Sequence, residues 1–343
     1  MPYPSCQAPI DQPERTGLSA TAQLPAAPKT TARLVLCLYK VRATDTLLVL
    51  QAGNSTMPTW VNPLPEDQPG IAVLPDELKP EAVFVVSDLH LGSGADPITG
   101  RLGPRENFLD DAGFAGFIAA QQPAALRDPV LVINGDFLDF LRIVEVPVTD
   151  DDFSRWGRQL ADLGAPRPES ELRALAAKER RFGLRTHDYK CIWKLQAMVT
   201  GHPRVFQGLN RWVADGGWIV IVKGNHDVEL YWPLVQQGIR RAIGGPNADT
   251  RILFCHGGLR VANLYLEHGH QHEAATKVIG PPVLPNGEEL TLPLGSFVNR
   301  YLINPLEWLD PYLDNIKPRE ALLRNKRASG RTQDLADAEA LDP

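Results

Sequence analysis

Three short apolar runs, each followed at once by polar residues, set the pattern of this chain. The runs are rich in β-branched residues and span 82–86, 130–133 and 218–222. Continuous apolar runs of this length are typical of strands buried on both faces of a parallel sheet. Between the first two, residues 107–122 carry apolar side chains on one helical face, and Pro123 ends the pattern. The pattern therefore predicts a βαβ unit and an α/β fold.

A long polar segment separates the second run from the third. Its periodicity predicts helices over residues 170–182, 187–200 and 203–214. We expect residues 141–203 to form a helical insertion that helps to select a substrate. Its basic residues fit either an anionic group of that substrate or a solvated helix face; they are Lys178, Arg180, Arg181 and Arg185.

The rest of the chain divides by composition. Residues 1–31 form a Pro- and Ala-rich leader that we expect to be mobile. Residues 32–80 form a β-rich extension that begins with a β-hairpin or strand pair over 32–51. The main domain covers 81–280, with a helix over 231–243 and strands over 251–255 and 259–266. Residues 281–343 are Pro- and Leu-rich and end in a charged helix former. Their apolar residues fit ordinary packing, an acyl pocket or a membrane contact; they are Trp308, Leu309 and Tyr312.

Composition narrows the class of protein. Hydrophobic residues make up 43% and charged residues 22%, as in soluble globular proteins, and the net charge of -6 argues against binding nucleic acid through a bulk positive field. The four cysteines are scattered without a Cys-x-x-Cys pair, so a reducing compartment is expected. No apolar run approaches the roughly 18–20 residues that span a bilayer. We therefore predict a cytoplasmic protein, with peripheral membrane contact left open.

The polar residues that follow the apolar runs are of the kinds that bind metals. The segments are Asp88-Leu89-His90, Gly135-Asp136-Phe137-Leu138-Asp139 and Gly224-Asn225-His226-Asp227, and a histidine cluster follows the later strands at 268–272. Each is weak by itself, since an Asp after a strand is often a helix cap. Because carboxyl ends of parallel strands meet at one edge of a sheet, we expect these side chains to gather there.

In this order the segments resemble the metallophosphoesterase (calcineurin-like phosphoesterase) superfamily over residues 82–272. The sequence of residues 87–92, Ser-Asp-Leu-His-Leu-Gly, is also similar to that of the branch that contains UDP-2,3-diacylglucosamine hydrolases. The resemblance implies a sandwich of two central β-sheets flanked by helices, with a helical insertion. It also implies two divalent metal ions, manganese first, with Fe, Co, Ni or Zn as alternatives.

The resemblance also implies which residues hold these ions. Asp88 and His90 would hold the first metal, and Asp136 would bridge the two. Asn225 would hold the second metal through its amide oxygen, joined by His268.

Two further residues would act on the substrate. By resemblance, His226 would stay free of metal and stabilise the transition state or protonate the leaving oxygen. Asp139 would orient it, in a role that fixes the tautomer; the alternative is a surface Asp in a turn.

The histidines near residue 268 admit two assignments. The family usually supplies a His-Gly after one strand and a Gly-His-x-His after a later one. In the first assignment these are His256-Gly257 and Gly269-His270-Gln271-His272, and the site is complete. In the second, His268 holds the second metal, and a later Gly-His-x-His is missing, which implies a truncated chain of impaired activity. The shortness of 258–267 favours the second assignment, with His270 retained as a further candidate ligand.

Together these features predict an enzyme that hydrolyses a phosphomonoester, phosphodiester or pyrophosphate with a metal-bound hydroxide. The substrate would be a phosphorylated small molecule or a lipid-linked one. Two alternatives remain: a pyrophosphatase acting on a UDP-linked glycolipid, and a catalytically impaired protein that keeps the fold to bind a partner.

Overall fold

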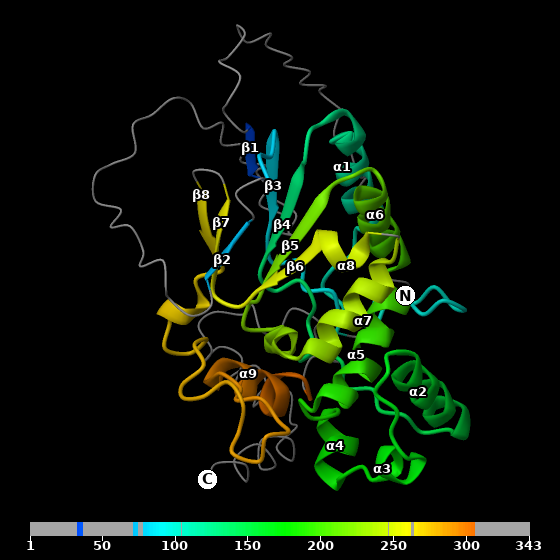
Figure 1. The fold of residues 1–343 in the computed structure, drawn as a ribbon. Helices are drawn as coiled ribbons and strands as arrows, with labels where there is room; N and C mark the ends of the chain where they lie inside the picture. The colour runs from blue at the N-terminus through cyan, green and yellow to red at the C-terminus, as the bar shows by residue number, and fades with distance from the viewer. Residues whose placement is uncertain are drawn as a thin grey trace, which may run out of the picture. The chain divides into compact units, whose positions relative to one another are not determined.

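The computed structural model describes residues 33–36, 71–74, 78–103, 105–245, 247–261 and 264–305. All of them belong to one compact unit, Ala32–Pro343. They form a mixed α/β fold, as the sequence predicts (Figure 1). The predicted leader, the second strand of the predicted hairpin and the aromatic residues after 305 lie outside the described residues. No helix in the described part of the chain is long and apolar enough to cross a membrane.

A five-stranded parallel sheet organises the fold. Its order is β1-β3-β4-β5-β6. The strands are β1 (Arg33–Leu36), β3 (Ala82–Val86), β4 (Val130–Asn134), β5 (Trp218–Val222) and β6 (Ile252–Cys255). The three predicted central strands are confirmed. Of the strand pair predicted over 32–51, only β1 lies in the described part of the chain, and it pairs in parallel with β3.

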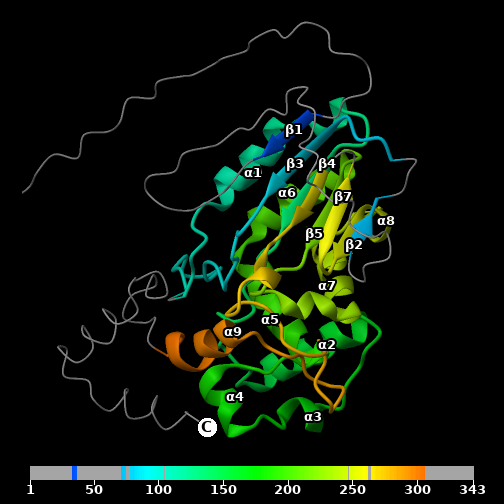
Figure 2. The ribbon, with the colours of Figure 1, turned by 90° about the vertical axis from the view of Figure 1, so that its left-hand side faces the viewer.

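A smaller sheet packs on one face of the large one. It consists of β2 (Ile71–Val73), β7 (Gly258–Val261) and β8 (Leu264–Glu267), in the order β2-β7-β8. The single strand predicted over 259–266 is wrong: the chain reverses after Val261, and β7 and β8 are antiparallel. Figure 2 looks onto this smaller sheet in front of the larger one.

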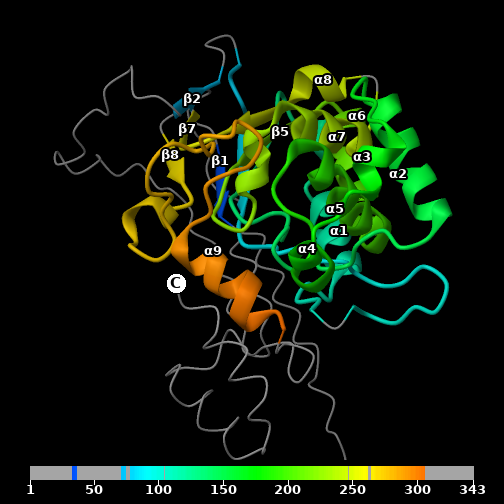
Figure 3. The same ribbon diagram turned by 90° about the horizontal axis from the view of Figure 1, so that it is seen from below.

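Alternating side chains of the large sheet belong to two hydrophobic cores, one on each face. One set, including Val85, Val132 and Val220, packs against residues of the small sheet. The other set, including Phe84, Leu131 and Ile221, packs against helices. Figure 3 shows α1, α6 and α7 on the opposite side of the large sheet from the small sheet. Burial on both faces explains why these strands read as unbroken apolar runs.

The helical face holds α1 (Asp111–Ala120), α6 (Pro203–Ala214), α7 (Pro233–Ile243) and the short α8 (Ala248–Arg251). Single turns of 3-10 helix occur at Pro123–Ala125, Val228–Tyr231 and His270–His272. The predicted helix over 203–214 is confirmed. The helix predicted from residue 107 begins only at Asp111, where the Asp110 carboxylate accepts the Gly113 N–H and caps it.

The insertion is helical, as predicted. It contains α2 (Asp150–Asp162), α3 (Glu169–Arg173), α4 (Ala177–Phe182) and α5 (Asp188–Gly201). The single helix predicted over 170–182 is wrong, because the chain leaves the helical conformation at Ala174, with φ -78° and ψ 60°. This break lets both Leu172 and Leu175 enter the core.

The last described segment joins the insertion to the loop after β5. It comprises α9 (Leu294–Val298) and a π-helix at Asn299–Ile303. Ser296 Oγ donates to Asn225 O at 3.1 Å, and Arg300 Nη2 donates to Leu184 O at 2.7 Å. The carboxyl edge of the large sheet is thereby connected to the insertion.

A buried histidine ties the loop after β3 to the end of the insertion. His202 Nδ1 lies 2.7 Å from Asp111 Oδ1, and its Nε2 lies 3.1 Å from Glu106 Oε2. Burial disfavours the charged ring, but the hydrogen bonds with Asp111 and Glu106 outweigh burial and raise the pKa of His202 to about 9.

This raised pKa predicts a pH-dependent contribution to stability. An unfolded histidine has a pKa of about 6.5, so protonated His202 stabilises the fold fully below that pH, and the effect is lost as pH rises through about 9. We expect His202→Gln to lower the free energy of unfolding by roughly 2–4 kcal/mol near pH 6 and by much less near pH 9.5. Urea denaturation at both pH values measures this, with exposed His272→Gln as the control. Equal losses at the two pH values would contradict it.

Candidate metal centre

The loops after β3 and β4 run side by side and carry four of the predicted site residues. Asp88 N donates to Gly135 O at 3.2 Å, and His90 N donates to Asp136 O at 2.8 Å, so pairing continues beyond the strands. Asp88, His90 and Asp136 have φ values of 56°, 49° and 49°, a conformation uncommon for residues other than glycine. Three such residues close together indicate backbone strain, which the hydrogen bonds between the two loops maintain. The strained backbone brings the three side chains to one place.

Two glycines allow the loops to come this close. A Cβ on Gly135, which has φ 85°, would collide with the ring of His268. A Cβ on Gly224 would collide with the carboxylate of Asp136. Both segments therefore need glycine for close packing around the site, and Gly135 is needed for its positive φ as well.

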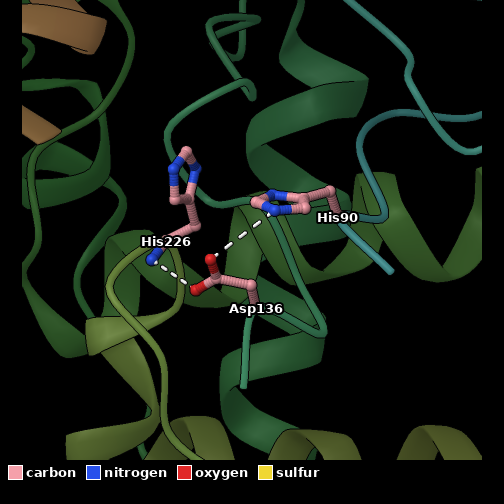
Figure 4. A group of neighbouring side chains, drawn as sticks. All are labelled: His90, Asp136 and His226. Carbon is pink, nitrogen blue, oxygen red and sulfur yellow. Dashed lines mark hydrogen bonds and ion pairs between the residues drawn. The ribbon is translucent and has the colours of Figure 1, made fainter. Parts of the chain in front are cut away.

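Asp136 lies at the centre of a first group of metal-capable side chains (Figure 4). Its buried carboxylate has Oδ2 3.5 Å from His90 Nε2, and its Oδ1 accepts the backbone N–H of His226 at 2.9 Å. The rings of His90 and His226 meet edge to face with their centroids 4.6 Å apart. One ligand atom from each of the three residues lies within 4.8 Å of the others, which is close enough for a single ion.

The same carboxylate belongs to a second group. Asp136, Asp88 and His268 also offer ligand atoms within 4.8 Å of one another, and His268 Nε2 lies 3.3 Å from Asp136 Oδ2. His268 Nδ1 lies 3.0 Å from the carbonyl of Asn134 and donates to it, which leaves Nε2 as the ligand atom once that nitrogen loses its proton. Asn225 Oδ1 lies 3.3 Å from His268 Nε2, so its amide oxygen is at this group.

Asp139 lies behind the first group and is completely buried. Its Oδ2 is 2.9 Å from His226 Nδ1 and 3.1 Å from His90 Nδ1, and it accepts from Arg142 Nε at 3.1 Å. The geometry is that of a carboxylate that fixes both imidazoles with a proton on Nδ1. Asp139 is thus beside His226, as its predicted orienting role requires, but it orients His90 as well.

Opposite charges compensate one another at the site. Burial would raise the pKa of Asp136, but the charge of His226 and the hydrogen bond with His268 hold it below its ordinary value. Burial lowers the pKa of His226, but Asp139 and Asp136 raise it to about 10. Asp136 likewise outweighs burial to raise the pKa of His268 to about 9. Protons on these rings thus balance the carboxylates, and a bound cation would displace them.

Asp227, the last residue of the Gly-Asn-His-Asp segment, holds two loops together. It is fully buried, and its two oxygens accept the N–H groups of Gly224 at 2.6 Å and Phe137 at 2.8 Å. Burial and the charge of Asp136 raise its pKa to about 7, although these hydrogen bonds oppose the rise. It therefore joins the loops after β4 and β5, a role that its position in the sequence did not suggest.

The grouping of ligands differs from the predicted one in two respects. His226, predicted to stay free of metal, lies in a group with His90, because Asp139 accepts from both rings and draws them together. Asp88, predicted to share a metal with His90, groups with His268, although Asp88 Oδ1 is also 3.9 Å from His90 Nε2.

The other histidines of this region lie outside both groups. His272 is exposed and pairs with Glu267 at 2.7 Å. His256 packs beside Tyr231, with ring centroids 5.5 Å apart, and His270 packs beside His268 at 5.3 Å. Of the two assignments considered for this region, the geometry brings His268 to Asp136. His270, the further candidate ligand, is adjacent to the centre without joining it.

Several residues around the centre escaped the sequence analysis. Arg142 supports Asp139 from three residues further on, and a buried arginine is invisible in a sequence without knowledge of its partner. Asn134 ends β4 and holds His268 through its carbonyl, which any residue type could supply.

Comparisons with known proteins identify no relative of this chain. No protein-family model, curated protein or solved structure matches this chain. What can be said of function therefore depends on the residues of the site and on their geometry.

Proposed function

We propose that this protein is a metal-dependent phosphoesterase that hydrolyses a phosphomonoester, phosphodiester or pyrophosphate. The observation that carries the proposal is the sharing of one buried carboxylate, Asp136, between two groups of metal-capable side chains. Such sharing is what two neighbouring ions require, and paired ions recur in enzymes that cleave phosphate esters. The two packed sheets, with helices beyond the larger one, accord with the metallophosphoesterase-like sandwich that we propose as the fold.

The residues present fit divalent ions. Imidazole nitrogens mixed with carboxylate and amide oxygens suit Mn, Fe, Co, Ni or Zn. His90, Asp136 and His226 would hold one ion, and Asp88, Asp136 and His268 the other, with Asn225 beside the second. When bound, two such ions supply an acidified water and neutralise charge on the phosphoryl oxygens.

The chain itself positions the proton that the reaction needs. Asp139 accepts from Nδ1 of His226, so Nε2 is the nitrogen left to bind either a metal or a substrate oxygen. The His226 side chain is 18% exposed, so it is partly open to a ligand, whereas Asp139 is shielded from water. His226 is therefore proposed to stabilise charge on the phosphoryl group or to protonate the leaving oxygen, with Asp139 as its positioning residue.

The test is hydrolysis of mono- and bis-nitrophenyl phosphate by the full chain, with each of the five metals in turn. We expect manganese-stimulated turnover, and we expect His226→Ala to reduce kcat by about 10²–10⁴-fold because it removes the ring whose Nε2 would act on the phosphoryl group or hold a metal. The control is His272→Ala, which also replaces a histidine. Because His272 is exposed and lies outside both groups, this variant should retain full activity. Absence of turnover with all five metals, or full activity of His226→Ala, would overturn the proposal.

A further inference from the structure

The helical insertion contains an open pocket that the proposed function does not use. The pocket has a volume of about 170 Å³, and none of its lining residues belongs to either group of candidate metal ligands. Its walls come from α3 and the segment before it, from the start of α5, from the residue after the turn Val228–Tyr231 and from residues 287–288. A cavity of roughly 150 Å³ holds one benzene molecule. This insertion pocket therefore has room for a single small ligand.

Segments far apart in the sequence meet at the insertion pocket and are joined there. Trp232 Nε1 donates to Thr186 O at 2.7 Å, and Leu290 N donates to Thr186 Oγ1 at 2.8 Å. Arg185 Nη1 also forms an ion pair with Glu289 Oε1 at 2.9 Å. These contacts fix the walls relative to one another, as is usual for small-molecule sites, which are largely preformed.

Aromatic rings form part of the wall. Tyr189 and Trp232 both line the insertion pocket, and the ring of His187 meets that of Tyr189 edge to face, with the centroids 5.6 Å apart. Burial lowers the pKa of His187, so this ring is uncharged near neutral pH. The faces of tryptophan and tyrosine rings attract cations, most strongly where water is excluded. The aromatic wall therefore favours a cationic ligand over an anionic one.

Acidic side chains outnumber basic ones around the insertion pocket. Glu171, Asp188 and Glu288 each contribute a carboxylate, and Arg167 contributes a guanidinium. The guanidinium lies over the Tyr189 ring, with its Cζ 5.0 Å from the ring centroid. Its Nη1 is 3.4 Å from Glu171 Oε1, and its Nη2 is 3.8 Å from Asp188 Oδ1. The pocket thus already accommodates one cation of the chain, and two of the three carboxylate charges remain to be balanced.

A buried hydroxyl at the insertion pocket also lacks a partner. Tyr189 is only 8% exposed, and its hydroxyl forms no hydrogen bond with any residue that the structure describes. Burial and the charge of Glu171 raise the pKa of Tyr189 to about 12, so the hydroxyl keeps its proton. Within the same part of the chain, the Glu288 carboxylate pairs only with the uncharged His187 ring, at 3.6 Å. Buried polar groups are ordinarily paired, so a positively charged ligand with a polar end would satisfy these groups.

We propose that the insertion pocket binds a small organic cation, an alkylammonium group with a hydroxyl or other polar end. The rings of Tyr189 and Trp232 would contact the alkyl groups around the nitrogen, and the carboxylates would balance its charge. The Tyr189 hydroxyl would bond to the polar end. Two sources share this chemistry: a free amine, and the cationic end of a phosphate ester. Only the second rests on the proposed function, and the binding test depends on neither.

Calorimetric titration of the full chain with choline tests the site. The matched probe is 3,3-dimethylbutanol, which has the same shape but carries carbon in place of the charged nitrogen. We expect choline to bind at least about tenfold tighter than this neutral probe, because only the cation interacts with the rings and the carboxylates. Added salt should weaken the binding of choline alone. Equal binding of the two probes, or no binding of choline, would overturn the proposal.

Variants of the lining residues locate the binding. The double variant Glu171→Gln, Glu288→Gln should weaken choline binding about tenfold, because it removes two of the charges that attract the cation. Arg167→Gln should instead tighten it severalfold, because it removes the competing cation. The matched control is Glu169→Gln, since Glu169 is exposed on the same helix α3 but does not line the pocket. Wild-type affinity in the double variant, or weaker binding in Arg167→Gln, would contradict the site.

A readout on the wild type guards against misfolded variants. Saturating choline should shift the indole N–H NMR signal of Trp232 and leave that of Trp212, which is buried outside the pocket, unchanged. An unshifted Trp232 signal would overturn the site. Choline binding without any metal-dependent hydrolysis would instead sink the proposed function and leave the site standing.

Phosphocholine separates the two sources of the cation. If the cation is the end of a phosphate ester, the manganese-loaded protein should hydrolyse phosphocholine, and the double variant should raise KM without lowering kcat. If it is a free amine, the carboxylates should repel the phosphate group, so phosphocholine should bind more weakly than choline does and should not be hydrolysed. Either result supports a cation site, whereas binding of both compounds that the double variant leaves unchanged contradicts it.

Discussion

Asp136→Asn is expected to abolish turnover and to remove bound metal from both positions. Asp136 is the only residue common to the two groups, and one carboxylate can offer an oxygen to each ion, whereas an amide offers one oxygen and an NH2 that repels cations. Loss of several kcal/mol of charge stabilisation corresponds to a fall in kcat of roughly 10³-fold or more. Elemental analysis of the purified variant should show far fewer than the ~2 ions per chain expected for a paired site.

The same variant should remain folded. The backbone N–H of His226 donates to Asp136 Oδ1 at 2.9 Å, and an asparagine oxygen can accept that bond. Removing the charge also relieves Asp227, whose pKa Asp136 helps to raise. It also removes a charge that balances the protonated rings of His226 and His268, so we expect a lower melting temperature in the absence of metal, with a single cooperative transition. Asp162→Asn, at an exposed position, is the matched control. Metal content and turnover equal to those of the control would refute the shared-carboxylate centre.

The sequence predicted the strand ends better than it predicted the surroundings of the site. Buried parallel strands read as apolar runs, and their carboxyl ends share one edge, so Asp88, Asp136 and His226 could be expected to meet. His268 was harder, because it comes from the second sheet and its approach depends on the absence of a side chain at Gly135. The resemblance to a family, rather than any spacing rule, pointed to it.

Other features depend on contacts between distant segments. The break between α3 and α4 has no glycine or proline, and burial of Leu175 explains it only once the core is known. The pairing of β1 with β3 joins segments almost fifty residues apart, which a local pattern cannot reveal. Local patterns therefore predict elements, whereas partners of polar groups require tertiary structure.

Asp139→Asn is expected to lower activity about 10²–10³-fold and to change its pH dependence, although Asp139 belongs to neither donor group. Asp139 Oδ2 accepts from His226, His90 and Arg142, and an asparagine there must either lose these bonds or bury its NH2 without an acceptor. The charge of Asp139 is the largest cause, after the opposing effect of burial, of the raised pKa of His226. Its removal should therefore lower that pKa.

The direction of the pH effect follows from the role of His226. If it acts as an acid, activity is lost as pH rises through its pKa, so the alkaline limb of the profile of kcat/KM should move to lower pH in Asp139→Asn. Arg142→Met serves as the comparison, because it disturbs the same buried pair but keeps the carboxylate beside the rings. A purely structural role would lower the free energy of unfolding of both variants by the roughly 3–5 kcal/mol typical of a broken buried pair, and leave both profiles in place. A shift to lower pH in Asp139→Asn, with none in that direction in Arg142→Met because Arg142 itself lowers the pKa of His226, instead assigns the carboxylate to positioning the proton on His226.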